Sequence, residues 1–346
     1  MSVNMSPSGM RAVRIRGGKG PSSSLYISSD EAVPQPSADE VLVKIASFGV
    51  NRMDLLQREG EYPLPPGTSP IMGVEFSGHV VSSPGSHFQR GEAVFGLVTG
   101  GAYAQYLTCP AHMVLAKPEK LSLAQAAAIP ENCLTAYQAL KLLAAISEGD
   151  SILVHAGASG VGLAAIQLVR LLGAAKVYVT AGSAEKCALC ERLGADLAIN
   201  YKEVDWAEEL AKRTGGRGVD VIVEFIGAGY FKQNLASLSR DGTLVLLGIM
   251  GGTEVQDVDI GLILYKRLRI QGSTLRSRSL AYQSSLVQDF LASGTPDRLV
   301  EGLDPQSDSA GQQILIHKIY SWHDIQAAHD EMEANKNVGK IVVRVD

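Results

Sequence analysis

Three glycines within six residues, Gly157, Gly160 and Gly162, give this 346-residue sequence its strongest chemical signal. They lie in "VHAGASGVGLAAIQL", between an apolar run that predicts a strand and an amphipathic run that predicts a helix. Glycine allows a tight turn and lets a pyrophosphate approach the backbone, where the first amides of the helix face its charge. The turn therefore predicts a dinucleotide site, with phosphate contacts from Ser159, Gly160 and Val161.

The end of the next predicted strand indicates which dinucleotide would bind. An NAD site carries an acidic residue about 20 residues after the glycine turn, where it binds the ribose 2′-hydroxyl. That position is Gly182, followed by Ser183, and Lys186 adds a positive charge one helical turn later. Glu185 is expected to point away, and a solvated surface lysine is the alternative for Lys186. Because such a site favours a 2′-phosphate, the sequence predicts NADPH rather than NADH.

The elements that must position these residues alternate along the middle of the chain. Apolar runs such as "SILVHAG", "KVYVTAG" and "VDVIVEFIG" are separated by segments with helical periodicity. Mostly apolar strands that alternate with helices are typical of a parallel sheet covered on both faces. We therefore predict a doubly wound, Rossmann-type NADPH-binding domain over residues 132–271.

The first 131 residues have a different texture. Short β-branched segments are separated by Gly, Pro and Ser, as in "GHVVSSPGSHFQRGEAVFGLVTGGAYAQYLTC". They predict a small, partly closed β-barrel. The last run, "GKIVVRVD", reads as a strand with no partner nearby, so we expect it to return to this domain. The predicted fold class is α/β, with a β-rich domain from residues 1–131 and 272–346.

Composition narrows the possible partners. Hydrophobic residues make up 46% of the chain, and the net charge of −5 gives no general attraction to nucleic acid or anionic lipid. Four cysteines are too few for a disulfide framework in a chain of this length and indicate a reducing compartment. No apolar run approaches the length of a membrane helix. We expect a cytoplasmic protein that acts on a small molecule.

Several blocks of sequence resemble a known family. They include "GVNRMDLLQREGEYPLPPG", "GVEFSGHV", "AAAIPENCLTAYQAL", "HAGASGVGLAAIQL" and "MEANKNVGKIVV", and they span nearly the whole chain in the family's order. The chain resembles the zinc-independent quinone oxidoreductases of the medium-chain dehydrogenase/reductase superfamily, above all their tumour-suppressor-inducible branch. The resemblance implies a GroES-like catalytic domain around a Rossmann domain. It also implies transfer of a hydride or single electrons from NADPH to a quinone.

The resemblance also implies which residues contact the coenzyme. The adenosine phosphate would contact Gly182, Ser183, Lys186 and Tyr201, beside Phe225, for which core packing is the alternative. On the nicotinamide side the implied contacts are Asn51, Thr135, Gly248, Ile249, Met250, Leu275, Arg276 and Ser277.

No metal site is predicted. The superfamily's alcohol dehydrogenases bind catalytic zinc through Cys, His and Cys, and the matching positions here are Asn51, Val74 and Glu131. Asparagine and valine cannot supply the thiolate or imidazole that zinc prefers. Cys187 and Cys190 have CxxC spacing but no second pair, so we expect two half-buried thiols.

Without a metal, the site suits acceptors that are already electron-poor. Tyr62, in "GEYPLPPG", is the candidate for orienting a carbonyl group, with a loop anchor as the alternative. Asn51 would fix a nicotinamide or acceptor group. Asp54 would orient Asn51 or cap a helix. His155 is expected to be buried and hydrogen-bonded rather than catalytic.

Two other functions remain open at this point. An enone or enoyl-thioester reductase would use the same scaffold, with Tyr62 as proton donor, and a non-catalytic NADPH-binding protein of the crystallin or RNA-binding kind would need no acceptor. The apolar segment "GLILYKRLRIQGSTL" predicts an exposed edge strand and a homodimer.

Overall fold

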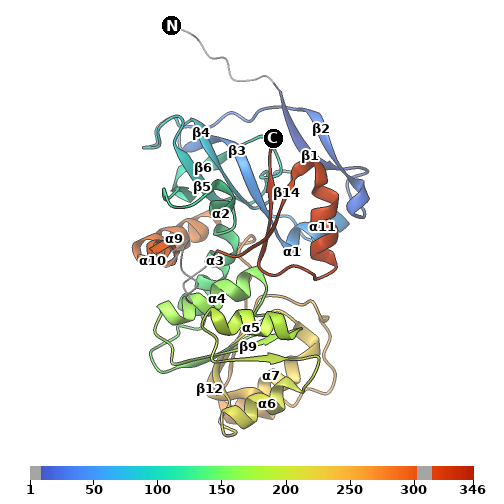
Figure 1. The fold of residues 1–346 in the computed structure, drawn as a ribbon, viewed down its shortest axis with the longest axis vertical. Coiled ribbons are helices and arrows are strands. Elements are labelled where there is room, and N and C mark those ends of the chain that lie inside the picture. The colour runs from blue at the N-terminus through green and yellow to red at the C-terminus, as the bar shows by residue number, and fades with distance from the viewer. Residues whose placement is uncertain (1–8, 302–313) are drawn as a thin grey trace. The chain divides into compact units, whose positions relative to one another are not determined.

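The structure, a computed structural model, describes residues 9–301 and 314–346. The chain forms two compact units (Figure 1). Unit 1 comprises Met1–Glu131, Arg276–Asp289 and Ile314–Asp346, and unit 2 comprises Asn132–Leu275 and Phe290–Gln313. The predicted α/β class is confirmed. The catalytic and coenzyme-binding roles, and the domain boundaries assigned with them, stay predictions.

Unit 1 is built on a seven-stranded sheet of order β14-β15-β3-β4-β5-β7, in which β6 also pairs with β3. All pairs are antiparallel except β14 with β15. A separate hairpin is formed by β1 and β2. The strands are β1 (Met10–Ile15), β2 (Leu25–Glu31), β3 (Glu40–Val50), β4 (Glu75–Ser82), β5 (Ala93–Leu97), β6 (Tyr106–Pro110), β7 (Val114–Ala116), β14 (Ile316–Ser321) and β15 (Lys340–Arg344).

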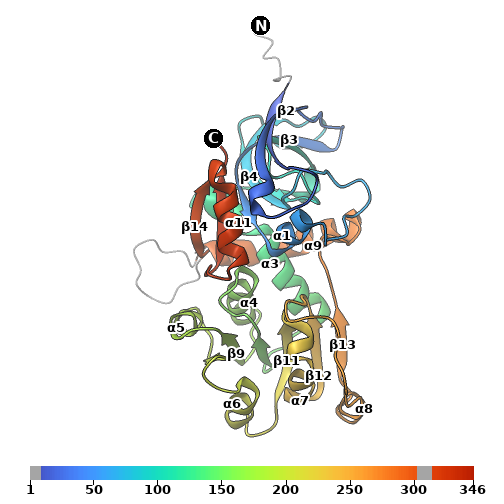
Figure 2. The same cartoon turned by 90° about the vertical axis from the view of Figure 1, so that its right-hand side faces the viewer.

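The last strand, β15, has two partners. It pairs with β3, with Ile341 opposite Val50, which confirms the predicted return to the first part of the chain. It also pairs with β14 in parallel, through the crossover helix α11 (Ile325–Glu333), so the expectation of no nearby partner was wrong. Figures 1 and 2 show this red C-terminal segment beside the blue strands of unit 1.

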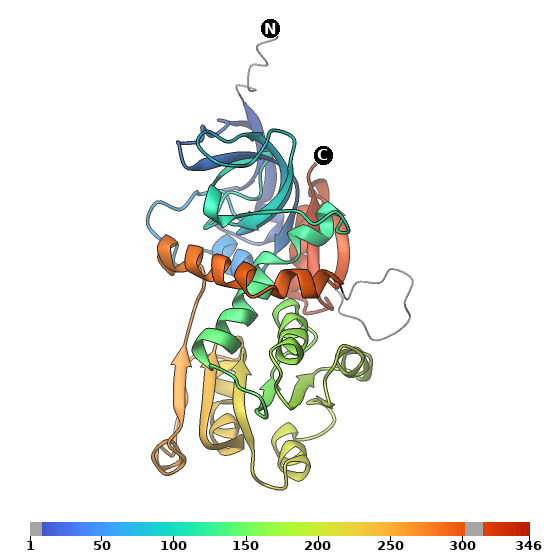
Figure 3. The same cartoon turned by 90° about the vertical axis from the view of Figure 1, so that its left-hand side faces the viewer.

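Unit 2 contains a six-stranded sheet of order β10-β9-β8-β11-β12-β13, in which every pair is parallel. Its core is apolar because the strands are covered on both faces, and Leu153, Ile222 and Leu244 are fully buried. The edge strand β13 is visible in Figures 2 and 3. The strands are β8 (Ser151–Val154), β9 (Lys176–Ala181), β10 (Leu197–Asn200), β11 (Val219–Glu224), β12 (Leu238–Leu246) and β13 (Arg269–Gly272).

The remaining helices connect these strands or flank the sheets. None of the described helices is long and apolar enough to cross a membrane. They are α1 (Arg52–Glu59), α2 (Leu123–Ala127), α3 (Pro130–Tyr137) followed by a π-helix (Gln138–Leu143), α4 (Gly160–Leu171), α5 (Ala184–Arg192), α6 (Trp206–Arg213), α7 (Phe231–Ser237), α8 (Gly261–Lys266), α9 (Leu280–Ala292) and α10 (Thr295–Glu301).

Candidate active site

Most of the residues predicted to contact a coenzyme lie at the carboxyl ends of the strands of the unit 2 sheet. Because all six strands run in the same direction, these ends, and the residues that follow them, lie along the same side of the sheet. The chain order reverses between β8 and β11, and that is where dinucleotides bind in such sheets. The predicted residues on this side of the sheet are Gly157 and 159–162 after β8, Gly182, Ser183 and Lys186 after β9, Tyr201 after β10, Phe225 after β11, 248–250 after β12 and Leu275 after β13.

The turn after β8 ends in a capped helix. Ala156 takes a left-handed conformation with φ of 49°, so the strand stops at Val154. Ser159 is the N-cap of α4, and its Oγ accepts the amide of Gly162 at 3.1 Å. The amides of Gly160 and Val161 belong to the first helical turn, which has no intrahelical acceptors. These amides and the helix dipole favour an anion there.

The glycines of this turn are required by the packing of the chain itself. A Cβ on Gly162 would lie 2.5 Å from the carbonyl oxygen of Ala156, as expected for close packing of the helix against the strand end. A Cβ on Gly160 would lie 2.6 Å from Nδ2 of Asn132. A larger side chain would therefore distort the turn even before any coenzyme is considered.

The end of β9 is surrounded by two lysines and a tyrosine. A Cβ on Gly182 would lie 2.7 Å from the Tyr201 hydroxyl and 3.4 Å from Cε of Lys202. Ser183 caps α5 by accepting the Lys186 amide at 3.3 Å. Burial and the nearby charge of Lys202 lower the pKa of Lys186. Sequence reasoning missed Lys202, although it follows Tyr201 directly at the end of the strand that neighbours β9.

Glu185 does not point away from this place. Hydrogen bonds from its own backbone amide and from the Ser183 hydroxyl lower the pKa of the Glu185 carboxyl. The exposed carboxylate therefore reaches back to the start of α5, and the prediction was wrong. The physical reason is that an acidic side chain in the first helical turn is attracted by the unpaired amides there.

The loops after β11 and β12 pack on each other. The Met250 amide donates to the carbonyl of Phe225 at 3.1 Å, and a Cβ on Gly248 would lie 2.8 Å from the same oxygen. Ile249 and Met250 are each about half exposed, at 53% and 52%. Phe225 is partly buried, an exposure intermediate between those expected for core packing and for a coenzyme contact.

His155 is buried among hydrogen-bond partners. Its Nε2 is 2.8 Å from Oδ1 of Asn234, and its Nδ1 is 2.9 Å from the Thr180 hydroxyl. Asn234 donates its amide nitrogen to Glu224, so its Oδ1 accepts from Nε2 of the histidine. Burial lowers the pKa of His155. This confirms the expected buried, hydrogen-bonded role.

Helix α1 begins at Asn51, directly after β3. The Asn51 backbone amide donates to Oδ2 of Asp54 at 2.8 Å, so Asp54 closes the first helical turn. The Tyr103 hydroxyl donates to the same oxygen at 3.1 Å. Oδ1 of Asp54 is buried and has no partner among the described residues. Burial raises the pKa of Asp54 to about 6.

A directed chain of hydrogen bonds lies behind Asp54. Arg58 has only donors, and its Nη1 lies 3.5 Å from Nδ1 of His329, which must therefore accept. His329 is then protonated on Nε2, which lies 3.2 Å from the Tyr103 hydroxyl and donates to it. Burial and Arg58 lower the pKa of His329 to about 3, so the ring is neutral. Sequence reasoning found none of this chain behind Asp54.

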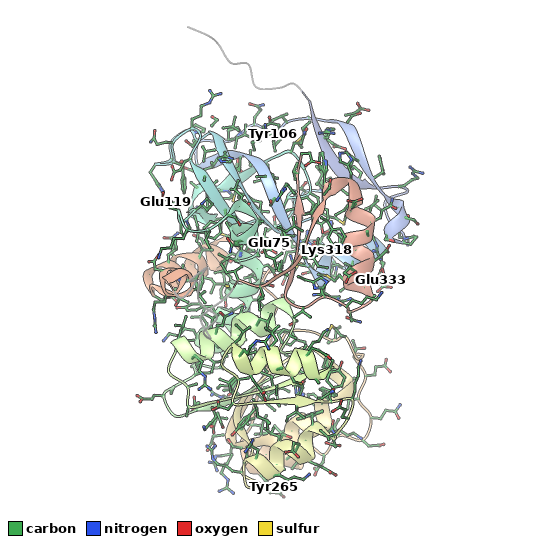
Figure 4. The ribbon with its side chains drawn as sticks, in the orientation of Figure 1. Glu75, Tyr106, Glu119, Tyr265, Lys318 and Glu333 are labelled. Carbon is green, nitrogen blue, oxygen red and sulfur yellow. The ribbon has the colours of Figure 1, made fainter. Side chains whose placement is uncertain are left out.

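The Asn51 side chain is held in a buried ionic cluster. Its Nδ2 donates to Oε1 of Glu75 at 2.9 Å, and its Oδ1 accepts from Nζ of Lys340 at 2.5 Å. Lys340 also forms an ion pair with Glu75, which Figure 4 labels in unit 1. The other oxygen of Glu75 accepts the Glu131 backbone amide at 2.9 Å. Burial and Glu75 raise the pKa of the Glu131 carboxyl to about 7.

Tyr62 is half-buried beside Arg276. The guanidinium lies 5.3 Å from the centre of the tyrosine ring. Arg276 donates from Nε to the Thr99 carbonyl at 2.7 Å and from Nη1 to Gln57 at 2.9 Å. Its buried Nη2 has no partner among the described residues. Burial raises the pKa of Tyr62. Of the other residues placed on the nicotinamide side, Thr135 is partly buried in α3 and Ser277 is exposed.

The two cysteines of the CxxC pair lie on α5. Cys187 is 8% exposed and Cys190 is fully buried, so the expectation of half-buried thiols was wrong. Burial raises the pKa of Cys190 to about 12. Within residues 9–301 and 314–346, no group of three or more His, Cys, Asp or Glu side chains is arranged to hold a metal ion.

Comparison with known proteins shows which families this chain matches. Residues 37–119 match the alcohol dehydrogenase GroES-like domain family, and residues 160–291 match the zinc-binding dehydrogenase family. A human quinone oxidoreductase is 36% identical over 271 residues, which cover 78% of this chain and 81% of that protein.

Two solved structures have the same fold. An Escherichia coli quinone oxidoreductase complexed with NADPH has a TM-score of 0.81 and 27% identity, over 96% of this chain and 99% of that one. The CurK enoyl reductase has a TM-score of 0.83 and 27% identity, over 98% of this chain and all of that one. With the parallel sheet, its glycine turn and the GroES-like sheet, these findings identify the chain as a member of the quinone oxidoreductase family of medium-chain dehydrogenases/reductases.

Proposed function

We propose that this oxidoreductase reduces quinones with NADPH, by transfer of a hydride or of single electrons, and does so without zinc. The observation that carries the proposal is the group of side chains around Gly182. Lys186, Lys202 and the Tyr201 hydroxyl surround the end of β9, and the position that is acidic in NAD enzymes is a glycine, Gly182, so two positive charges stand there against the single carboxylate of Glu185. NADPH is also the coenzyme in the related Escherichia coli structure.

The residues at the glycine turn fit the rest of such a coenzyme. Ser159, Gly160 and Val161 offer a helix start for the pyrophosphate. Gly157 and Gly162 keep the turn narrow. The exposed loop 248–250 and the neighbouring Phe225 lie at the same sheet edge. When bound, the coenzyme supplies the reducing electrons; the chain's own residues bind it, orient it and exclude water.

The residues do not fit the zinc that the second family's name implies. Asn51, Val74 and Glu131 stand at the three ligand positions, and their donor set is an amide, an alkyl group and one carboxylate. The Asn51 amide is already held between Glu75 and the Lys340 ammonium. A divalent cation would have to displace a buried positive charge, so no step in the proposed reaction uses zinc.

Two groups of unit 1 are proposed to orient the acceptor. Asn51 has a second Nδ2 hydrogen that makes no bond to the described residues, and Tyr62 carries a hydroxyl on the ring that lies against the Arg276 guanidinium. Either can donate to a carbonyl oxygen on which negative charge develops. A reduced quinone takes up a proton readily, so a dedicated acid is not required. Asp54 supports the helix that carries Asn51.

An enone or enoyl-thioester reductase is the second candidate, because the CurK enoyl reductase shares the fold at similar identity. A panel of ortho-quinones, para-quinones, alkenals and enoyl thioesters, each assayed with NADPH and with NADH, separates the two candidates. We expect turnover of quinones and a lower KM for NADPH. Faster turnover of enoyl thioesters would favour the second candidate. Tight NADPH binding with no turnover would favour a non-catalytic binding protein.

We also propose a cytoplasmic homodimer, for which the exposed edge strand β13 of the unit 2 sheet is the candidate interface. All four residues of β13 are exposed, and among the strands of residues 9–301 and 314–346 only β12 pairs with it. Nearby Ile260, Leu264 and Tyr265 are 73%, 71% and 77% exposed. Exposed strand edges and apolar side chains favour pairing with a second copy. Sedimentation at micromolar concentration showing only monomer would contradict this.

A further inference from the structure

Lys340 is a buried lysine whose ammonium contacts the Asn51 side chain. We propose that Lys340 is a positioning residue that fixes the orientation of the Asn51 amide, so that one N–H of Asn51 is presented to the carbonyl oxygen of the acceptor. This inference rests on the proposed function, because it assigns a task to a residue that orients the acceptor. It adds Lys340 and its partner Glu75 to the residues on which the reaction depends.

The position of Lys340 is set by the pairing of distant strands. Lys340 is the first residue of β15, and the register of β15 on β3 places Ile341 opposite Val50, next to Asn51. Lys340 is only 2% exposed. The neighbouring Gly49 leaves room for its side chain, because a Cβ there would lie 2.6 Å from Cε of Lys340. The ammonium is therefore held against Asn51 by backbone geometry.

The chemistry of Lys340 and Glu75 determines where the oxygen and the nitrogen of the Asn51 amide lie. A lysine ammonium has only donors, so it must contact Oδ1 of Asn51, as it does at 2.5 Å. An ionised Glu75 has only acceptors, so it must face Nδ2, as it does at 2.9 Å. A flipped amide would set donor against donor and acceptor against acceptor. The structure therefore allows one orientation of Asn51.

Glu75 cannot turn away from this arrangement. Its second oxygen accepts the backbone amide of Glu131 at 2.9 Å, and its first is shared by Asn51 and Lys340. With one Nδ2 hydrogen bound to Glu75, the other is the one donor of the Asn51 side chain that makes no bond within the described part of the chain and is left for a ligand. An N–H held in place in advance stabilises developing charge better than one that must reorient.

A double-mutant cycle tests this through kcat/KM for a quinone. One variant is Asn51→Ala. The other is Lys340→Met combined with Glu75→Gln, which removes both charges of the ion pair, so that the carboxylate of Glu75 is not left buried without its lysine. The third protein carries all three substitutions. Lys318→Met is the matched control, because Lys318 is an exposed lysine on the adjacent strand β14 (Figure 4). NADPH affinity, from quenching of protein fluorescence, is measured for every protein.

If Lys340 acts through Asn51, each variant loses about tenfold or more in kcat/KM. Removal of one hydrogen-bond donor to a developing oxyanion typically lowers the rate by about 10²–10³-fold. The triple variant then loses no more than Asn51→Ala alone, because the effects of coupled groups are not additive. The NADPH affinity of the variant that lacks both charges stays within twofold of that of Asn51→Ala, and Lys318→Met keeps full activity.

Two results would overturn the inference while leaving the proposed function intact. They are full activity of the Lys340→Met and Glu75→Gln variant, or losses that multiply in the triple variant. A wild-type protein that binds NADPH but reduces no quinone overturns the proposed function and this inference with it. If the double variant fails to fold, Lys340→Gln replaces Lys340→Met. It keeps an N–H donor for Oδ1 of Asn51, so the inference requires it to retain most of the activity.

Discussion

The stability of unit 1 should depend on pH through Asp54. Burial raises the pKa of this carboxyl from 3.8 to about 6, and each pKa unit corresponds to about 1.4 kcal/mol. Between these two values the folded chain binds a proton that the unfolded chain has released. The free energy of unfolding therefore falls by about 3 kcal/mol as the pH rises from about 4 to above 6. This loss of stability is complete at neutral pH.

Asp54→Asn isolates this effect. Asparagine keeps an oxygen that can accept from the Asn51 amide and the Tyr103 hydroxyl, but it carries no charge. We expect the variant to gain stability relative to the wild type as the pH rises, by about 3 kcal/mol between pH 4 and pH 7. Urea unfolding at several pH values measures the difference.

The sequence offers a convenient probe for that assay. It contains two tryptophans, and Trp322 is fully buried in unit 1 whereas Trp206 lies in unit 2. In a Trp206→Phe background, the fluorescence of Trp322 reports the unfolding of unit 1. Asp330→Asn, on the exposed side of α11, is the control: it keeps Asp54, so its stability should change with pH as that of the wild type does. A difference between Asp54→Asn and wild type that is the same at pH 4 and pH 7 would refute the reasoning.

Three further predictions concern coenzyme and acceptor. Lys186→Ala and Lys202→Ala should each raise the KM for NADPH by about tenfold or more, the value of one charge-assisted contact. Steady-state assays should show little change in the KM for NADH. Lys176 is an exposed lysine at the start of β9, and Lys176→Ala should change the KM of neither coenzyme. Glu185→Gln should lower the KM for NADPH severalfold, since a carboxylate near Ser183 repels the 2′-phosphate; an unchanged ratio of NADPH to NADH use would argue against that repulsion. Tyr62→Phe should reduce kcat/KM for quinones while leaving NADPH affinity unchanged, and full activity would reduce Tyr62 to an anchor of its loop.

The features predicted well from sequence are those set by short stretches of chain. The parallel strands of unit 2 are continuous apolar runs, and the start of α4 follows from glycine, serine and an amphipathic repeat within a few residues. Glu185 was misplaced because the pattern gives a side chain's position on the helix but not its rotamer.

The rest depends on which distant strands pair. Asn51 and Lys340 are 289 residues apart, and Tyr103 and His329 are 226 apart. Nothing in either local sequence indicates the other, because the contact follows from the register of β15 on β3 and from the crossover through α11. A lysine near the C-terminus therefore reads as an ordinary surface residue until the sheet is known.

The return of β15 to β3 also has a consequence for synthesis on the ribosome. Until the last residues emerge, β3 pairs with β4 on one side, while on its other side β6 covers only residues 40–44 and leaves residues 47–50, where β15 will bind, as an open edge. Open strand edges invite pairing with other chains. The nascent chain must therefore keep this edge protected while the whole of unit 2 is translated. A chain that stops just before Lys340 would keep the edge permanently and should aggregate.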